Sequence, residues 1–154
     1  MSGNSTQALR IREYRPIDAA YLHWIDQVCF ASDIAYSRSE MLFYLNQPGS
    51  IARIAERTSE VVGFALGRVQ VDRWAHVLTL DVLPEARRQK VGTLLMNSLH
   101  DEFRNRNVAL AVLEVSTKNL AARRLYEALQ YQLLETLRGY YNGREDAYRM
   151  VRFF

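Results

Sequence analysis

The feature that most constrains the fold is a strand, a loop, a helix and a second strand that follow one another between residues 76 and 115. HVLTLDVL (76–83) and the almost continuously apolar ALAVLEV (109–115) have the composition of buried strands. Between them, apolar residues from Val91 to Phe103 recur every three or four positions, which predicts an amphipathic helix. Such a connection is a right-handed crossover that makes the two strands parallel. Ligands of sheets of this kind bind outside the carboxyl ends of the strands.

Further strands and helices are expected on both sides of this crossover. Ser37 and Glu40 have the spacing of a capping box, and Asn142-Gly143 is typical of a tight turn between strands. The sequence contains no repeat, linker or low-complexity tract, so we expect residues 1–154 to form a single α/β domain. The other expected elements are a strand at 8–13, a helix ending near Phe30, a short helix after Ser37, strands at 50–56 and 61–71 joined by a loop at 57–60, a helix at 119–129, and a hairpin of 131–141 and 146–153.

The composition narrows the classes of partner. The 20 Lys and Arg exceed the 17 Asp and Glu by only three charges, which favours a local basic loop over a basic surface and gives no support for nucleic acid. Cys29 is the only cysteine, so an internal disulfide and multi-cysteine metal sites are excluded, and we expect no metal. The sequence has no run of about 18 apolar residues, and its start, MSGNSTQ, is polar rather than a secretory leader. We therefore expect a cytoplasmic protein with no membrane partner.

The stretch RRQKVGT (87–93) places three basic residues, Arg87, Arg88 and Lys90, just before Gly92 and the predicted helix. One interpretation is a solvated surface loop. The other is a phosphate site, because the first turn of a helix presents unpaired N–H groups and the positive end of its dipole. The position of the stretch, after the carboxyl end of a predicted strand, favours anion binding.

Glu114 interrupts the apolar strand 109–115 near its carboxyl end. An unpartnered buried carboxylate is costly, so this side chain must be paired, protonated or directed into a cleft. Two interpretations fit: a structural ion pair with an arginine, or a catalytic base whose pKa is set by its surroundings.

His76 opens the strand that leads to the basic loop. By the period of two, its side chain is expected to share a face with Leu78, Leu80 and Val82, with Asp81 on the opposite face in a structural role. A histidine at such a position is more often packed than catalytic, so the strand pattern alone does not assign it chemistry.

Tyr126 and Asn119 lie on the helix that follows the Glu114 strand. An aromatic residue on an amphipathic helix is usually part of the core, but a phenol stays protonated at neutral pH and suits a general acid. Asn119 begins the helix, where an N-cap role alone would explain it. Tyr140 and Tyr141 adjoin the last turn, and because adjacent strand residues point to opposite faces, at most one is expected to pack inward.

Three stretches resemble, in order and spacing, the GNAT superfamily of acetyl-CoA-dependent acyltransferases: HVLTLDVLPEARRQKVGTLLM, LEVSTKNLAARRLYEALQY and GYYNGREDAYRM. Within it they are most similar to the N-terminal acetyltransferases, the bacterial ribosomal-protein-alanine N-acetyltransferase and its archaeal and eukaryotic relatives. The resemblance covers about residues 8 to 152 and is specific over 76 to 150. It implies a mixed sheet of about seven strands, whose central parallel strands splay apart, with about four helices.

The resemblance also implies acetyl-CoA as co-substrate and a role for each candidate residue. Glu114 would be the general base, Tyr126 the acid that protonates the departing thiolate, and His76 a relay that passes a proton through water. Contacts to the coenzyme would come from Leu80, Asp81, Val82, Arg87, Arg88, Gln89, Lys90, Val91, Gly92, Thr93, Asn119 and Tyr126. The first residues of a peptide would be clasped by Tyr36, Tyr140 and Tyr141.

The sequence departs from the family pattern at two positions. Lys90 stands where the pyrophosphate-binding loop has its first glycine, and Gln130 stands where glycine usually follows the last helix. Glycine tolerates close backbone approach and positive φ, which other residues do not adopt freely. The charge of Lys90 can compensate at the loop, and Gln130 concerns a helix end rather than chemistry.

The expected activity is acetylation of the N-terminal α-amine of a protein or peptide. An α-amine with a pKa of about 7.8 is partly neutral near pH 7.5, whereas a lysine of about 10.4 is neutral roughly 0.1% of the time. Alternatives are acetylation of a small amine, an amino acid or a lysine side chain, and, from another class, a non-catalytic acyl-CoA-binding sensor. We expect a monomer or a weak homodimer.

Overall fold

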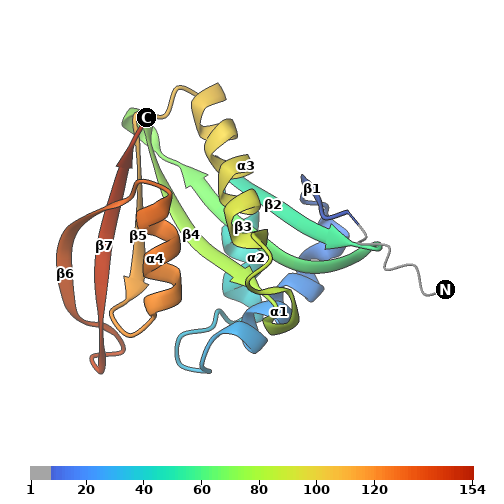
Figure 1. The fold of residues 1–154 in the computed structure, drawn as a ribbon, viewed down its shortest axis with the longest axis horizontal. Helices are drawn as coiled ribbons and strands as arrows, with labels where there is room; N and C mark the ends of the chain where they lie inside the picture. Colours follow the sequence, from blue (N-terminus) through green and yellow to red (C-terminus); the bar gives the residue numbers. More distant parts are fainter. Residues whose placement is uncertain (1–7) are drawn as a thin grey trace.

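A seven-stranded mixed sheet runs through the computed structural model, which describes residues 8–154 (Figure 1). The polar start MSGNSTQ, on which the absence of a leader was predicted, lies outside the described residues. The strand order is β1-β2-β3-β4-β5-β7-β6, in which β4 and β5 are parallel and the other neighbouring pairs are antiparallel. The strands are β1 (Arg10–Glu13), β2 (Ser50–Arg57), β3 (Glu60–Val69), β4 (Trp74–Val82), β5 (Leu110–Ser116), β6 (Gln132–Tyr141) and β7 (Glu145–Phe153).

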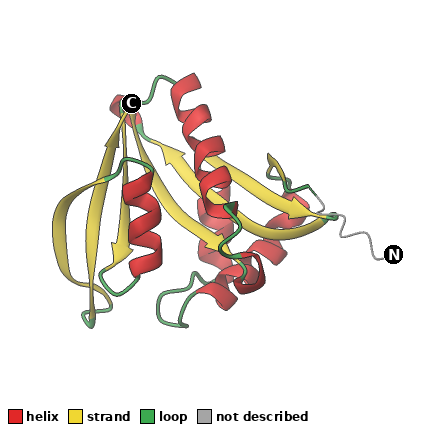
Figure 2. Cartoon of the chain, in the orientation of Figure 1, coloured by secondary structure: helices red, strands yellow, loops and turns green. Residues whose placement is uncertain are grey.

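Four α-helices cover the two faces of the sheet (Figure 2). The helices α3 (Val91–Asn105) and α4 (Leu120–Ala128) pack on one face, and α1 (Ala19–Cys29) and α2 (Arg38–Leu45) on the other. Each face has its own buried cluster, because each helix presents one apolar side to the sheet. The predicted mixed sheet with four helices is thus confirmed. In residues 8–154, no helix is both long and apolar enough to span a membrane.

The boundaries differ from the sequence prediction by a few residues. The predicted loop 57–60 is shorter, because β2 and β3 are joined by Thr58 and Ser59 alone, both at positive φ. The capping box of α2 is confirmed: the Glu40 N–H donates to Ser37 Oγ, and the Ser37 N–H donates to the Glu40 carboxylate. The turn between β6 and β7 also lies where Asn142-Gly143 predicts it.

The two central parallel strands separate soon after they begin. Only Trp74–His76 of β4 pairs with Leu110–Val112 of β5, and beyond these residues the strands diverge (Figure 1). The splay expected from the family resemblance is therefore confirmed. Backbone N–H and C=O groups that face the gap lack a neighbouring strand, so they are available to a ligand that enters between the strands.

A bulge in β4 changes which side chains face which helices. The register with β3 shifts between Leu66 and Gly67, so that Val77 pairs with Gly67 but Thr79 pairs with Leu66. A register shift of one residue reverses the face on which the following side chains lie. After the bulge, Asp81 lies opposite Phe64, on the face covered by α1 and α2.

The predicted grouping of the β4 side chains is wrong for this reason. Leu78 packs with the α1–α2 cluster, whereas Leu80 and Val82 pack with the α3–α4 cluster. Asp81 lies on the same face as Leu78 rather than opposite it. Alternation by two cannot reveal a bulge, because the extra residue is defined only by the register with the neighbouring strand.

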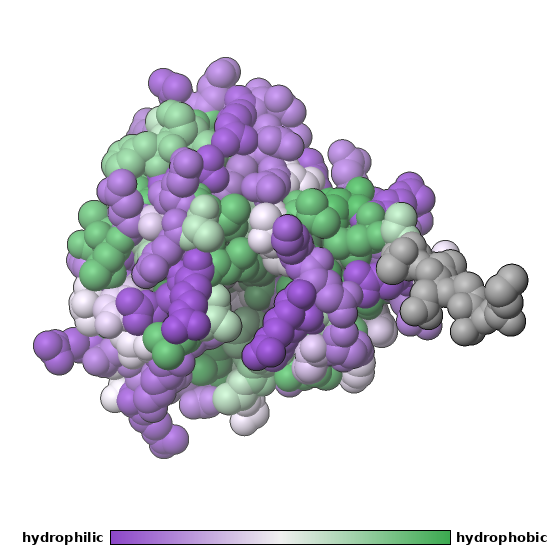
Figure 3. Space-filling view, viewed as in Figure 1, coloured by the Kyte–Doolittle hydropathy of each residue, from purple (hydrophilic) through white to green (hydrophobic). Residues whose placement is uncertain are grey.

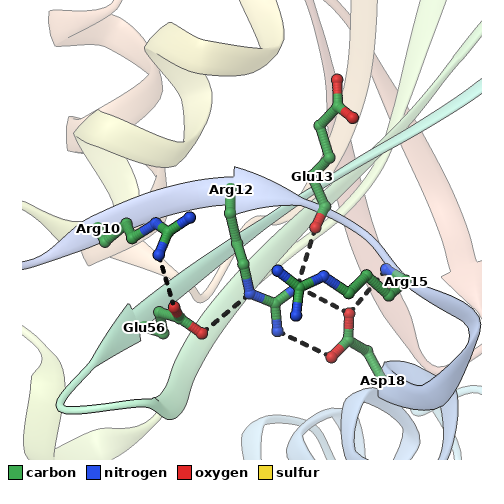
Figure 4. A network of polar contacts seen from close by, with 6 residues as sticks. All are labelled: Arg10, Arg12, Glu13, Arg15, Asp18 and Glu56. Carbon is green, nitrogen blue, oxygen red and sulfur yellow. Dashed lines mark hydrogen bonds and ion pairs between the residues drawn. The ribbon is translucent and has the colours of Figure 1, made fainter.

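A network of ion pairs fixes the outer edge of the sheet (Figure 4). Arg12 of β1 donates to both oxygens of Asp18 at 2.9 Å and to Glu56 of β2 at 2.9 Å. The hydrogen bonds from Arg12 outweigh burial and hold the pKa of Asp18 below its usual value. The pairs tie β1, β2 and the turn before α1 together, at a distance in the fold from the separated strands.

Gln130, which stands where the family usually has glycine, ends α4 in a conformation that favours glycine. Gln130 has a φ of 70°, in the left-handed region. Its N–H donates to the Glu127 carbonyl, and the Tyr131 N–H donates to the Tyr126 carbonyl at 2.9 Å. This is the Schellman motif, in which the residue after the C-cap takes positive φ.

Gln130→Gly is expected to stabilise the fold. A non-glycine residue in this conformation costs about 1–2 kcal/mol, and the extra backbone freedom of glycine in the unfolded chain returns about 0.5–1 of that. The net gain in the free energy of unfolding should be up to about 1.5 kcal/mol, measured by urea titration. Ala128→Gly, two residues earlier in helical conformation, is the matched control and should lose about 1 kcal/mol. Equal losses in the two variants would contradict the strain assigned to Gln130.

Candidate active site

A cavity of about 680 Å³ lies where β4 and β5 separate. Figure 3, viewed as in Figure 1, shows a hollow near the middle of the molecular surface, with apolar residues on its floor and hydrophilic residues around it. Of the residues predicted from the sequence, those that line the cavity are Tyr36, His76, Leu80, Glu114, Asn119, Tyr126, Tyr140 and Tyr141. Those that lie outside its lining are Asp81, Val82 and the loop residues 87–93.

Glu114 is the most highly connected polar group of the cavity. Its side chain is 7% exposed, and Oε1 lies 2.6 Å from His76 Nε2 while Oε2 accepts from Arg149 Nε at 3.2 Å. The Tyr140 hydroxyl also donates to Oε1, at 3.3 Å. The two interpretations of Glu114 are therefore not exclusive, since the carboxylate is paired with an arginine and at the same time lines the cavity.

The partners of Glu114 determine its charge. Burial raises the pKa of the carboxyl, but the hydrogen bonds and charges of His76 and Arg149 together outweigh burial and leave the pKa below its usual value. Glu114 is consequently ionised at neutral pH. An ionised carboxylate only accepts hydrogen bonds, so the proton between the two side chains belongs to His76 Nε2.

Tyr126 and Asn119 are held by the two ends of α4. Asn119 Oδ1 accepts the N–H of Ala122 at 3.2 Å, which is the N-cap bond expected of it. Tyr126 lies in the last turn, is 7% exposed and has a carbonyl bound in the Schellman motif. Burial raises the pKa of the Tyr126 phenol, so the group stays protonated and can donate a proton into the cavity.

The basic loop meets the N-terminus of α3 in a conformation suited to an anion. Arg88 and Lys90 have φ values of 62° and 64°, so Lys90 does adopt the left-handed conformation of the glycine it replaces. Successive N–H groups in such a turn form a concave anion site, and the first N–H groups of α3 have no intrahelical acceptor. Gly92 keeps α3 close to α4, because a Cβ there would lie 3.0 Å from Leu125.

Some side chains of the loop make hydrogen bonds to other segments of the protein, and the side chain of Val91 is buried. Arg87 Nε donates to the Val82 carbonyl, and the Gln89 side chain accepts from Arg57, so these two brace the loop. The Val91 side chain is buried, so this residue can offer a ligand only its backbone.

Three tyrosines reach the cavity from segments far apart in the sequence. Tyr36, between α1 and α2, donates its hydroxyl to the Leu78 carbonyl at 3.2 Å. Tyr140 and Tyr141 lie together at the end of β6, with their rings edge to face at 5.0 Å. The prediction that at most one of these two packs inward is confirmed, because Tyr140 is 45% exposed, although both residues line the cavity. Gly139, at a φ of 64°, lies just before them, where the register of β6 with β7 shifts.

Comparison with known proteins identifies the fold and the family. Residues 17–131 match the model of the acetyltransferase (GNAT) family. The chain belongs to this family. It is an N-acetyltransferase that depends on acetyl-CoA.

Several relatives of this acetyltransferase share most of its length. The ribosomal protein bS18-alanine N-acetyltransferase of Escherichia coli K12 is 35% identical over 121 residues, which cover 76% of this chain and 81% of that protein. An N-alpha-acetyltransferase of Saccharolobus solfataricus is 31% identical over 121 residues, covering 71% and 72%. The crystal structure of Ard1 from Thermoplasma volcanium has a TM-score of 0.87 and 28% identity, and the match covers 95% of this chain and 97% of Ard1.

Two polar residues of the site were not predicted from the sequence. Arg149 binds Glu114 because the two residues pair directly in the register of β5 with β7. Asp26 of α1 lines the cavity floor and is 1% exposed. A charged residue on the buried side of an amphipathic helix is a signal visible in the sequence, although its partner is not. Within residues 8–154, no three His, Cys, Asp or Glu side chains lie close enough together to hold a metal ion.

Arg149→Gln is expected to destabilise the acetyltransferase in a pH-dependent way. Glu114 has a lowered pKa in the fold, so it contributes stability above its ordinary pKa, and this contribution is lost as the pH falls through the lowered value. Arg149 is 34% exposed, so solvent screening limits the loss to about 1 kcal/mol at pH 7. The loss should shrink as the pH is lowered, which urea titrations at several pH values measure.

Arg10→Gln is the control, because Arg10 is 68% exposed and lies 3.9 Å from Glu56. It should leave the free energy of unfolding within about 0.5 kcal/mol of the parent. A loss in R149Q that is the same at every pH would show that the charge of Arg149 does not act through Glu114.

Proposed function

We propose that this acetyltransferase transfers the acetyl group of acetyl-CoA to the N-terminal α-amine of a protein or peptide. The observation that carries the proposal is the meeting, in one cavity, of an ionised Glu114 bound to His76, a protonated Tyr126, and tyrosines from two segments far apart in the sequence. The names of the bacterial and archaeal relatives, an alanine N-acetyltransferase and an N-alpha-acetyltransferase, support the same acceptor.

The features around the cavity fit a thioester of coenzyme A. Such a co-substrate supplies an activated acetyl group and a thiol as leaving group. The left-handed residues Arg88 and Lys90 and the first N–H groups of α3 suit its diphosphate. The unpaired backbone of β4 beyond His76, including Leu80 in the cavity wall, can bind its amides and stabilise charge on the acetyl oxygen.

Glu114 and His76 accept and transfer the proton that the acceptor amine loses. The carboxylate accepts a proton of the amine through water. Because His76 Nε2–H is donated to this carboxylate, His76 relays a proton only through Nδ1, its other ring nitrogen. Tyr126 acts on the leaving group rather than on the amine, because its phenol can protonate the departing thiolate.

The low pKa of Glu114 favours an α-amine over a lysine. The two amines differ in pKa by roughly 2.6 units, which corresponds to about 3.5 kcal/mol at 1.36 kcal/mol per unit. A carboxylate stabilised by Arg149 and His76 is a weak base, so it suits an amine that is already partly neutral. Tyr36 on one side and Tyr140 with Tyr141 on the other then clasp the first residues of the acceptor.

A peptide screen tests the acceptor. Peptides that differ in their first two residues, and that carry an internal lysine, are incubated with acetyl-CoA and the enzyme, and mass spectrometry locates the added group. We expect acetylation at the α-amine, with lysine at least 10²-fold slower, because its neutral fraction is smaller. Peptides blocked at the N-terminus are the control. Acetylation of small amines alone would favour the small-amine alternative.

Glu114→Gln is expected to lower kcat at least about 10²-fold while leaving acetyl-CoA binding unchanged, since the change removes the base but not the coenzyme contacts. Steady-state kinetics with a free N-terminal peptide that the parent enzyme acetylates, and calorimetry with acetyl-CoA, measure the two quantities. Glu135→Gln is the matched control, because Glu135 binds the same Arg149 at 2.7 Å but lies outside the cavity lining. Unchanged turnover in E114Q would remove Glu114 from the base role.

Binding of acetyl-CoA without turnover in the parent enzyme would support the sensor alternative.

A further inference from the structure

Two buried carboxyl groups, Asp26 and Asp81, lie within hydrogen-bond reach of each other, and Asp26 lines the cavity. Asp81 of β4 is 0% exposed and Asp26 of α1 is 1% exposed. Because of the bulge in β4, Asp81 lies on the face that α1 covers. Neither carboxyl has a role in the proposed chemistry, and burying two such groups side by side is costly unless each oxygen has a partner.

Two of the four oxygens have a partner in protein. Asp81 Oδ1 accepts from the Thr79 hydroxyl, and Asp26 Oδ2 accepts from the Tyr36 N–H at 2.7 Å. The other two, Asp81 Oδ2 and Asp26 Oδ1, are buried without a hydrogen-bond partner in the described residues. One proton between them satisfies both, because a protonated carboxyl donates and an ionised one accepts. Burial and the neighbouring Asp26 both raise the pKa of Asp81, as such a proton requires.

We propose that Asp26 and Asp81 share one proton at neutral pH and that this acid pair positions Tyr36 at the mouth of the acceptor site. The role of Tyr36 in acceptor binding rests on the proposed function, whereas the shared proton does not. Asp26 and Asp81 are positioning residues, since they act on the acceptor only through Tyr36.

Three hydrogen bonds hold Tyr36, and the acid pair provides one of them. Its N–H is bound by Asp26, its carbonyl accepts from Gln27 Nε2 at 2.7 Å, and its hydroxyl donates to the Leu78 carbonyl. Loss of the shared proton would leave two adjacent negative charges, which repel each other and push α1 away from β4. Tyr36 would then lose the anchor of its backbone.

The other groups around the pair fix the direction of its pH response. The pKa of Cys29 of α1 is raised to about 11, chiefly by burial, so the thiol stays neutral over the working range. Burial also raises the pKa of Tyr36 and of Tyr126 on α4. Arg87, in the loop after β4, is the cation whose charge favours the ionised form of Asp81. The transition that remains is loss of the shared proton on the alkaline side.

Asp81→Asn isolates the proton, because the amide can accept from Thr79 and donate to Asp26 but cannot ionise in this range. Infrared difference spectra at neutral pH should show a protonated carboxylic acid band in the wild type that disappears in D81N. Asp18→Asn is the matched control: Asp18 is buried but ionised by Arg12, so its replacement should leave the band intact. A band that persists in D81N would overturn the proposal, whatever the acceptor is.

The effect on Tyr36 has two readouts. Hydrogen exchange of the Tyr36 amide should be slow in the wild type and D81N but fast in Asp81→Leu, which leaves Asp26 without its partner. The acceptor KM of the wild type should rise on the alkaline side, by up to about tenfold per pH unit beyond the loss of the proton, and stay flat in D81N. Equal Tyr36 exchange in D81L and wild type, or superimposable KM profiles, would overturn the positioning role. If no peptide is acetylated but the band and the exchange behave as stated, the proposed function fails and the hold of the acid pair on Tyr36 stands.

Discussion

The separation of β4 from β5 is the constraint on which the rest of the site depends. A buried strand must satisfy its backbone N–H and C=O groups, yet beyond His76 and Val112 the two strands no longer pair. The gap is tolerated because it opens into a cavity where a polar chain or water can bind those groups. The bulge in β4 falls in the same region and turns Asp81 toward α1. Ligand binding and the placement of side chains thus have one origin, the irregularity of a single strand.

The site holds two buried carboxyl environments with opposite protonation. Glu114 is ionised because His76 and Arg149 offset its burial, whereas the pKa of Asp81 is raised by its burial and by the neighbouring carboxyl of Asp26. Similar groups acquire different protonation states when their partners differ in charge. The first is suited to receive a proton during turnover, and the second to hold one in the resting fold.

The order of the elements and the crossover could be predicted from the sequence, because they depend on local periodicity and on turn residues such as Asn142-Gly143. The faces of the β4 side chains could not, because a bulge breaks the period of two. Arg149 and Asp26 were missed for a related reason. Their partners are set by strand register and helix packing, which join residues far apart in the chain.

The weak basicity of Glu114 connects the architecture to the choice of acceptor. Strand pairing of β5 with β7 places Arg149 beside Glu114, so the fold itself lowers the pKa of the carboxyl. A base weakened in this way does little for an amine that must first lose a tightly held proton, but it suffices for one that is partly neutral. Discrimination between α-amines and lysines can therefore arise before any contact with the acceptor's side chains. Under the proposed function, the tyrosines around the cavity then need only to select among N-termini.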